Sequence, residues 1–157
     1  MNTTRRNRLA AATLSVAALL SLGWPSDGHA QEADVKAALD ASQAAIHSLN
    51  IGDIAKVWSH AADVTLVNPL DKTVAVGWDA VKSRWEAVFT FVSGVDIKQT
   101  DGPYITVTDN IARAVGIVHV TVHFKSQDPK ESNYVETDVL QKQDGHWLVV
   151  SHTAKPI

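Results

Sequence analysis

Two titratable side chains in the C-terminal half of the chain could carry out acid–base chemistry. Asp138 lies between Thr137 and Val139 in a run rich in β-branched residues, and His152 follows the apolar residues 147–150. A carboxyl group and an imidazole that both reach a bound molecule can take up and deliver its protons. If Asp138 points into a core, burial favours its neutral acid form, which donates to a ligand oxygen; if it points outward, it is an ordinary solvated carboxylate. The sequence leaves both orientations open.

His119 and His123 suggest a metal site, but their spacing argues against one. They are four residues apart, which along a strand at roughly 3.4 Å per residue is about 13 to 14 Å. One zinc ion needs both ring nitrogens at about 2 Å. Alternation with valines favours an exposed or dimer-facing sheet surface for both histidines, and a ligand contact by His119 is the alternative. We expect no metal ligands among the site residues.

Aromatic residues supply material for the wall of an apolar ligand site. Trp58, Trp85 and Phe89 fall in predicted helices, where they belong either to the core or to the lining of a cavity. Tyr134 could add a hydroxyl group. Asn68 follows a predicted strand and could also reach the site. The predicted ligand contacts are therefore Trp58, Asn68, Trp85, Phe89, His119 and Tyr134.

The elements that must position these side chains change type once along the chain. Helical spacing of apolar residues predicts a helix over 32–50, a shorter one from 54 that is capped by Asp53, and a third that is capped by Asp79. Alternating and β-branched runs predict strands at 64–67, 73–76, 95–99, 104–108, 112–125, 134–142 and 147–153. Asp101-Gly102-Pro103 is expected to be a turn between two of them. Helices followed by an antiparallel meander predict one α+β domain.

The first thirty residues have the pattern of a signal peptide. Arg5, Arg6 and Arg8 precede an apolar stretch over 9–22, and Gly28-His29-Ala30 offers small residues at a cleavage site. The apolar stretch is shorter than the roughly 20 residues of a membrane-spanning helix. We therefore expect residues 1–30 to be removed, leaving a periplasmic or secreted domain over 31–157 that is not attached to a membrane. Whether export uses the general or the twin-arginine route stays open.

Composition excludes several function classes. The chain contains no cysteine and has a formal net charge of −3, so thiolate metal sites and cysteine nucleophiles are excluded. Its clustered positive charge lies in the segment expected to be removed, which argues against a nucleic-acid partner. No phosphate-binding glycine loop or zinc-protease motif is present. We expect no cofactor.

Three stretches in this order resemble a known family. They are LNIGDIAKVWSHAADVTLVNP, VGWDAVKSRWEAVF and TDVLQKQDGHWLVV, and they are similar to the SnoaL-like branch of the nuclear-transport-factor-two and ketosteroid-isomerase superfamily. The resemblance implies a strongly curved antiparallel sheet that N-terminal helices close into a cone-shaped pocket. It also implies a homodimer that pairs through the open face of the sheet.

The resemblance does not carry over the catalytic residues of ketosteroid isomerases. Their aspartate base precedes a proline, where this chain has Asn68, and their tyrosine donor matches Ala45. Their second aspartate falls near Asp138 or Thr137. Relatives tend to carry a histidine at the position of Ser151, so His152 is shifted by one residue, which reverses the side of a regular strand.

Three functions remain open from the sequence. The leading one is binding of a small, partly apolar organic molecule in the pocket. The second is a cofactor-independent acid–base enzyme, such as an isomerase, cyclase or dehydratase, that uses Asp138 with a histidine, His152 being the predicted partner. The third is a non-catalytic dimeric interaction module.

Overall fold

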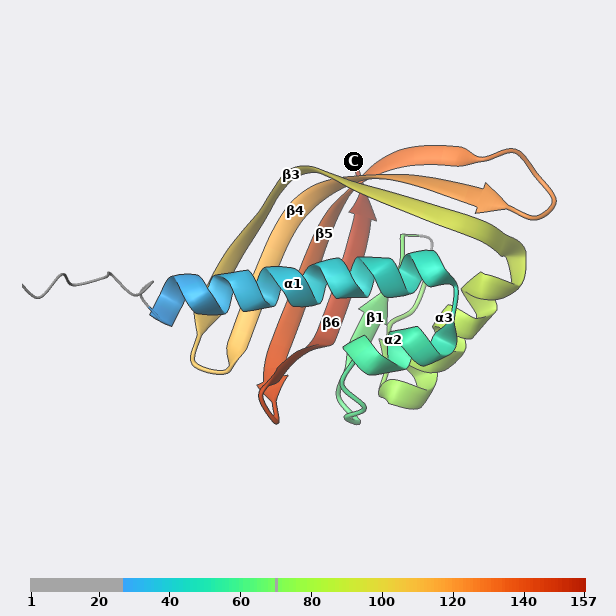
Figure 1. Ribbon diagram of the computed structural model, residues 1–157. Helices are drawn as coiled ribbons and strands as arrows, with labels where there is room; N and C mark the ends of the chain where they lie inside the picture. Colours follow the sequence, from blue (N-terminus) through green and yellow to red (C-terminus); the bar gives the residue numbers. More distant parts are fainter. Residues whose placement is uncertain (1–26, 70) are drawn as a thin grey trace, which may run out of the picture.

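The computed structural model describes residues 27–69 and 71–157, which form a curved sheet with helices on one side (Figure 1). Most of the predicted signal peptide lies outside the described residues. In chain order the elements are α1 (Asp27–Ser48), α2 (Ile51–Val57), β1 (Thr65–Val67), β2 (Ala75–Val76), α3 (Trp78–Phe91), β3 (Val92–Thr108), β4 (Ile111–Phe124), β5 (Lys130–Gln143) and β6 (His146–Pro156). In this part of the chain no helix is long and apolar enough to cross a bilayer.

The six strands lie in the order β2-β1-β6-β5-β4-β3. The last four form the expected antiparallel meander, and β1 and β2 form the expected antiparallel hairpin. However, β1 runs parallel to β6, so the sheet is mixed rather than purely antiparallel. The pairing is parallel because β1 reaches its neighbour from the helical segment instead of through a hairpin turn.

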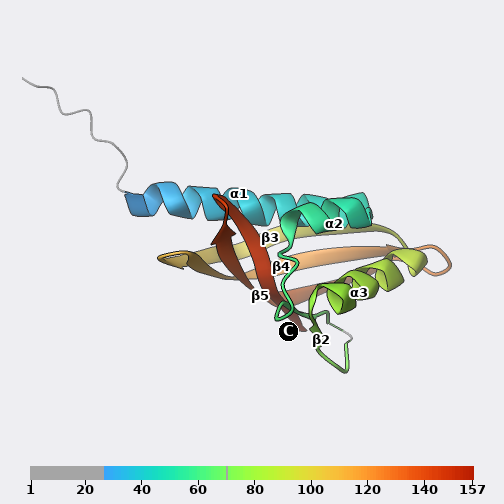
Figure 2. The ribbon, with the colours of Figure 1, turned by 90° about the horizontal axis from the view of Figure 1, so that it is seen from below.

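The helices cover the concave face and one end of the sheet. Figure 2 shows α1 as a layer on one side of the strands, with α2 and α3 at the end near β1 and β2. Val35, Leu39 and Ile46 of α1 are buried, as are Val81 and Trp85 of α3. These residues recur at helical spacing, which explains why the sequence forms helices that pack on an apolar sheet.

The break between the first two helices lies earlier than predicted. Leu49 adopts a left-handed conformation with φ 52°, and the Asn50 side chain accepts a hydrogen bond of 2.7 Å from the Gly52 backbone N–H. Asn50 is therefore the N-cap of α2, and Asp53, expected as the cap, lies in its first turn. Asp79 likewise lies in the first turn of α3, whose cap position is Gly77.

The predicted turn at Asp101-Gly102-Pro103 is wrong, because β3 runs through it as one strand over 92–108. The pairing with β4 shifts register on either side of Asp101, as at a β-bulge. The irregular backbone comes so close to β4 that a Cβ on Gly116 would lie 2.8 Å from the Asp101 carbonyl oxygen. A glycine on the neighbouring strand thus allows the irregularity that sequence signals present as a turn.

Candidate functional site

Three titratable side chains meet on the concave face of the sheet. Asp138 of β5 and His152 of β6 are register partners, and His152 Nδ1 lies 2.8 Å from Asp138 Oδ1. Glu136 is two residues before Asp138 on the same face, and its Oε1 lies 3.8 Å from His152 Nδ1. The three side chains are 9 to 13% exposed. They form a compact carboxylate–imidazole–carboxylate cluster under the helical layer.

His152 reaches this face because β6 contains a bulge. Val139 pairs with Ser151, but the next residue of β5, Leu140, pairs with Val149. Val150 is therefore an extra residue, and the alternation changes phase across it. Regular alternation from the buried Val149 would point His152 outward; with the bulge, Val149 and His152 are both buried. The expected reversal of side does not occur.

The cluster is charged, and its members shift one another's pKa values. Burial lowers the pKa of His152, but the Asp138 carboxylate outweighs burial by its charge and its hydrogen bond, with help from Glu136, and raises this pKa to about 9. The imidazole is therefore protonated at neutral pH. Burial raises the pKa of Glu136 above its usual range, and the His152 charge opposes this shift. Glu136 therefore gives up its proton at a higher pH than a solvated glutamate does.

Two members of the cluster, Glu136 and His152, line an apolar cavity of about 220 Å³. Glu136, His152 and Tyr134 contribute polar groups from the sheet, and Asn68 and Asp71 contribute from the loop after β1. Apolar side chains of α1, α3 and the sheet complete the wall: Ile46, Trp85, Val88, Phe91, Val92, Val95, Ile97, Val118, Val120, Val122, Phe124 and Ala154, together with Pro69. A largely apolar pocket with a few convergent polar groups is typical of small-molecule sites.

Two N–H groups of this wall have no acceptor among the described residues. They are Asn68 Nδ2 and Trp85 Nε1, whose atoms are buried. The indole of Trp85 also lies beside the catalytic candidates, with its ring centroid 6.5 Å from that of His152. Buried donors are nearly always paired in folded proteins, so these two are exceptions among the described residues.

An ion pair holds the loop that carries Asn68. The Asn68 backbone N–H donates 2.8 Å to Asp71 Oδ2, and the Asp71 N–H donates 2.9 Å to the Asn68 carbonyl oxygen. The other Asp71 oxygen contacts the Arg84 guanidinium of α3. Arg84 therefore ties the loop to the helix that also supplies Trp85.

A second, smaller cavity of about 160 Å³ also borders the cluster. Glu136 and Asp138 line it, together with Gln43 and Lys36 of α1 and Gln99 of β3. Of the three cluster residues, Glu136 lines both cavities, His152 only the first and Asp138 only the second. The second cavity is polar enough to hold waters, so Glu136 stands between an apolar ligand space and a polar one.

The structure brings together only part of the predicted site. The cavity of about 220 Å³ is lined by Asn68, Trp85, Tyr134 and His152. Asp138 does not line it, but its Oδ1 lies 2.8 Å from His152 Nδ1. Trp58, predicted as a wall residue, is buried in the core, where it bridges to Val149.

The other two predicted contacts lie outside the cavity. Phe89 packs against Trp85, with the two ring centroids 5.9 Å apart, and does not line the cavity. His119 alternates with the cavity residues Val118 and Val120, so it faces the opposite side of the sheet, where Asn133 Oδ1 lies 3.0 Å from its Nδ1. Alternation with buried valines was the signal for this surface position.

Glu136 was missed by sequence reasoning. It shares its face with Tyr134 and Asp138, and that periodicity was the available signal. The deciding property is its burial, which a strand pattern alone does not give.

The cluster has donor types that suit a cation, although its protonation opposes one. Glu136, Asp138 and His152 each offer one ligand atom, all within 4.8 Å of one another. The nitrogen that would bind a metal is the Nδ1 that faces Asp138. Because the pKa of His152 is about 9, a cation would have to displace a proton at neutral pH.

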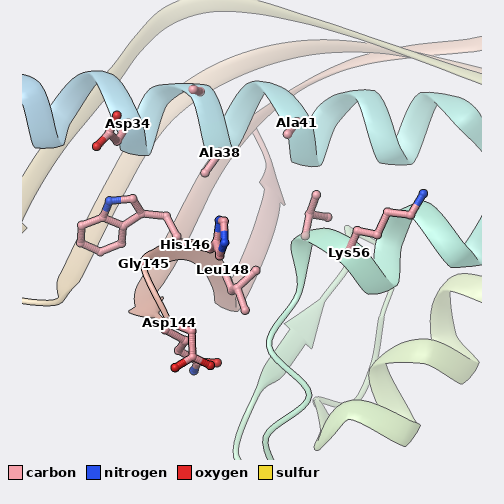
Figure 3. A pocket seen from close by; sticks show the side chains of 12 residues that line it. Asp34, Ala38, Ala41, Lys56, Asp144, Gly145, His146 and Leu148 are labelled. Carbon is pink, nitrogen blue, oxygen red and sulfur yellow. The ribbon is translucent and has the colours of Figure 1, made fainter.

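A larger recess of about 700 Å³ lies elsewhere, between α1, α2 and the turn from β5 to β6 (Figure 3). Ala38 and Ala41 of α1 face it, with Lys56, Asp144 and His146 around it. These charged groups do not converge: the Lys56 ammonium pairs with Asp53 at 2.8 Å and points away from Asp144 in Figure 3. The cavity of about 220 Å³, which Glu136 and His152 line, is therefore the better candidate site.

Comparisons with known proteins agree with this architecture. The model of the SnoaL-like domain matches residues 35–154. A nuclear transport factor 2-like superfamily protein from Salmonella enterica serovar Typhimurium superposes with a TM-score of 0.74 at 14% identity, covering 82% of this chain and 92% of that one. No curated protein sequence matches the chain.

Two further structures have informative descriptions. A protein of the nuclear transport factor 2-like family from Streptomyces avermitilis, proposed to be a dehydratase, gives a TM-score of 0.75 at 18% identity, covering 82% of this chain and 98% of that one. A ketosteroid isomerase-like protein from Erwinia carotovora atroseptica gives 0.69 at 21% identity, covering 80% and 95%. The α+β fold expected from the sequence, a curved sheet with N-terminal helices, is thereby confirmed.

Proposed function

Because this chain belongs to the SnoaL-like domain family, we propose that its cavity binds a small, partly apolar organic molecule and catalyses a proton transfer on it without a cofactor. One observation carries the proposal: the buried Glu136 carboxyl opens onto an apolar cavity beside the His152–Asp138 ion pair. A general base or acid works best when its pKa lies near the working pH. Burial moves the pKa of Glu136 in that direction.

Each member of the cluster has a distinct role in this proposal. Glu136 is the catalytic residue that takes a proton from the bound molecule and returns it. His152 lines the cavity as an imidazolium and stabilises negative charge that develops there. Asp138 is a positioning residue, because it holds His152 Nδ1 at 2.8 Å without lining the larger cavity. This differs from the sequence-based hypothesis, in which Asp138 itself was the acid or base.

The second cavity supports repeated turnover. Glu136 lines it as well as the ligand cavity, so its proton can exchange with water there while the apolar space is occupied. A catalytic acid–base group needs such a route, because it must recover its starting protonation state after each cycle.

Isomerisation and dehydration are the reaction types that we favour. Isomerisation removes a proton from one atom and delivers one to another. Dehydration removes a proton from carbon, breaks a C–O bond and delivers a proton to the departing hydroxyl group, which leaves as water. One carboxyl group and an imidazolium can perform the proton transfers of both reactions. The descriptions of the Streptomyces and Erwinia proteins name these two chemistries. Cyclisation by the same acid–base groups remains an alternative within this proposal.

The test compares Glu136→Gln with the unchanged protein on a panel of small cyclic ketones, enones and β-hydroxy ketones. Binding is followed by tryptophan fluorescence, because Trp85 lines the cavity, and turnover by NMR. The amide keeps the shape of the side chain but cannot take up a proton, so we expect binding within a few-fold and a loss of turnover of about 10² or more. His119→Gln, on the opposite face of the sheet, is the matched control and should leave both unchanged.

Other outcomes would redirect the proposal. Turnover that persists in Glu136→Gln would remove Glu136 from the mechanism. Binding without turnover of any panel member would favour a non-catalytic small-molecule carrier, and an absence of binding would favour an interaction module.

We also propose that the domain acts after export, on the basis of its first thirty residues. Residues 28–30 are exposed at the start of α1, and the first buried residue of this helix is Val35. Among the described residues, cleavage after Ala30 would therefore remove only the exposed first turn of α1. N-terminal sequencing of protein from its own source should begin at Gln31, and a chain that begins at Met1 would contradict export by cleavage.

A further inference from the structure

Two histidines and one aspartate meet at the edge strand β3. His47 belongs to the last turn of α1, Asp96 to β3 and His123 to β4. Asp96 Oδ2 lies 2.9 Å from His123 Nε2, and Asp96 Oδ1 lies 3.5 Å from His47 Nδ1. None of the three lines a cavity described above. One carboxylate therefore has an imidazole at each of its oxygens, and the three side chains come from three different elements.

A glycine in β3 leaves room for this arrangement. Gly94 is the register partner of His123, and Asp96 is the partner of Thr121. His123 therefore reaches Asp96 diagonally across the two strands. A Cβ on Gly94 would lie 3.3 Å from His123 Cδ2, which is a tight contact. The absence of a side chain at position 94 thus allows the imidazole to lie over β3 and to contact the carboxylate.

The hydrogen bond of His47 leaves its second ring nitrogen free to bind a metal ion. His47 Nδ1 lies 3.0 Å from the Val95 carbonyl oxygen, and it donates this hydrogen bond because a carbonyl oxygen only accepts. In the neutral imidazole the proton is then on Nδ1 and the lone pair is on Nε2. Histidines that bind metals usually show this pattern, in which the other ring N–H is donated to a carbonyl or carboxylate oxygen.

The spacing of His123 and Asp96 is close to that of two ligands on one ion. Two atoms that bind a tetrahedral zinc ion at about 2.0 to 2.1 Å lie roughly 3.3 Å apart, compared with 2.9 Å between His123 Nε2 and Asp96 Oδ2. His47 has to turn to add its Nε2, because Nδ1 makes the present contact with Asp96. The three side chains are 41 to 68% exposed, so an ion can reach them and they are free to change rotamer.

We propose that His47, Asp96 and His123 bind a divalent transition-metal ion such as Zn²⁺, with water as the fourth ligand. Two imidazoles and one carboxylate are a known ligand set of zinc, whereas Mg²⁺ and Ca²⁺ prefer oxygen ligands. Spacing along the strand argues against His119 as a second ligand beside His123, and the fold brings His47 there instead. This inference does not depend on the proposed function, because none of its three ligands lines the cavity.

A metal ion at this place would hold the end of α1 against β3 and β4. Each of the three ligands is next in sequence to a residue that lines the cavity of about 220 Å³, these residues being Ile46, Val95, Val122 and Phe124. The ion would therefore join three parts of the cavity wall from outside. The chain has no cysteine, so a disulfide cannot make this link. Because the unfolded chain lacks the assembled site, binding stabilises the folded state.

The first experiment titrates tag-free protein with Zn²⁺ and with Mg²⁺ by isothermal calorimetry. We expect saturable Zn²⁺ binding that His47→Gln, Asp96→Asn and His123→Gln each weaken about tenfold or more, since loss of even a supporting partner of a metal ligand costs roughly that factor. Mg²⁺ should not bind, because imidazole is a poor ligand for it. His119→Gln is the matched control. It removes an exposed histidine of the same strand, whose Nε2 lies 3.6 Å from Glu131 Oε2, and it should keep the Zn²⁺ affinity.

Two further measurements locate the ion and its effect. In ¹H–¹³C spectra, saturating Zn²⁺ should shift the imidazole signals of His47 and His123 but not those of His119 and His152. The comparison with His152 separates this site from the buried cluster, which also has the donor types of a metal site. In thermal unfolding followed by circular dichroism, Zn²⁺ at about 100 times its Kd should raise the Tm by about 5 °C. His47→Gln should remove most of this increase.

Each result either supports the site or contradicts it. An absence of saturable Zn²⁺ binding, or an affinity that His47→Gln and His123→Gln leave unchanged, would overturn the proposal. Weaker binding in His123→Gln alone would contradict the link to α1, because His47 would then not be a ligand. Equal affinity for Mg²⁺ and Zn²⁺ would contradict the assigned class of ion. Shifted signals of His152 with unchanged signals of His47 would place the ion in the buried cluster and also overturn the proposal.

Discussion

His152 combines two properties that rarely occur together, namely deep burial and a positive charge. It is 7% exposed, which by itself would favour the neutral imidazole. Asp138 at 2.8 Å and Glu136 at 3.8 Å reverse this preference. The balance matters for catalysis because an imidazolium fixed by protein charges stabilises negative charge in the cavity without reorienting.

The same balance predicts how stability depends on pH. The folded-state pKa of His152 is raised from 6.5 to about 9, so its stabilising contribution is complete below pH 6.5 and is lost as pH rises through about 9. A shift of this size corresponds to on the order of 3 kcal/mol. The raised pKa of Glu136 acts with the same sign from pH 4.5 upward. Urea unfolding of the unchanged protein should therefore show a free energy of unfolding that decreases above pH 6.5.

Two variants isolate the His152 contribution. His152→Gln should give a flatter curve above pH 6.5, while His119→Gln, which alters a histidine on the outer face, should keep the slope of the unchanged protein. Equal slopes in all three proteins would contradict a buried imidazolium.

At the residue scale, sequence reasoning identified Asp138 and His152 but missed Glu136. Alternation shows that Glu136, Asp138 and Tyr134 share a face, but it cannot show which face of the sheet the helices cover. Conversely, Trp58 and Phe89 were predicted as ligand contacts because they are large and apolar. Those properties do not separate a core residue from a wall residue, since both bury apolar surface.

At the scale of elements, single-residue irregularities decide what faces the cavity. The extra Val150 in β6 returns His152 to the concave face, and the irregular pairing around Asp101 keeps β3 continuous. Both involve the neighbouring strand: the bulge lies opposite Val139 and Leu140, and Gly116 leaves room beside Asp101. Sequence patterns within one strand do not contain this information, whereas the helix and strand order follows from local periodicity and was predicted.

The link between α3 and the loop after β1 leads to a prediction for this element. Arg84 contacts Asp71, which accepts the Asn68 N–H at 2.8 Å. Arg84→Gln should weaken this arrangement by about 1 kcal/mol, so amide hydrogen exchange at Asn68 and Asp71 should become roughly five-fold faster.

A control on the same helix tests whether the effect is local. Lys82 pairs with Glu86 at 3.7 Å on the exposed side of α3, and Lys82→Gln should leave exchange in the loop unchanged. If Arg84→Gln also has no effect, the ion pair does not hold the loop, and the position of Asn68 must be fixed by the strand alone.

For the whole molecule, the order of elements and the family resemblance predicted the architecture, and the match over residues 35–154 confirms the family. The parallel pairing of β1 with β6 joins segments that are far apart in the sequence. No local pattern records such a pairing. The register also defines an outer face of the sheet, opposite to the cavity, that the helices leave uncovered (Figure 1).

This outer face carries apolar side chains at its centre. Val115, Ile117, Val135 and Val139 alternate with the inward-facing residues of β4 and β5, and each remains partly exposed. Polar groups surround them, including the His119–Asn133 contact. An apolar centre with a polar rim is the usual composition of a protein interface, so we expect two copies to pair through this face.

Ile117→Asp tests this expectation at the scale of the assembly. In a dimer the change places a charge in the buried centre of the interface, where it lacks a partner, and it leaves the cavity on the other face untouched. Light scattering should therefore give twice the chain mass for the unchanged protein and one chain mass for the variant, with similar circular dichroism. Val74→Asp, at an apolar residue that is 54% exposed outside this face, should remain a dimer. A monomer in the unchanged protein would mean that the outer face is not an interface between copies, and because Glu136, His152, Asn68 and Trp85 all come from one chain, the proposed site would not depend on that result.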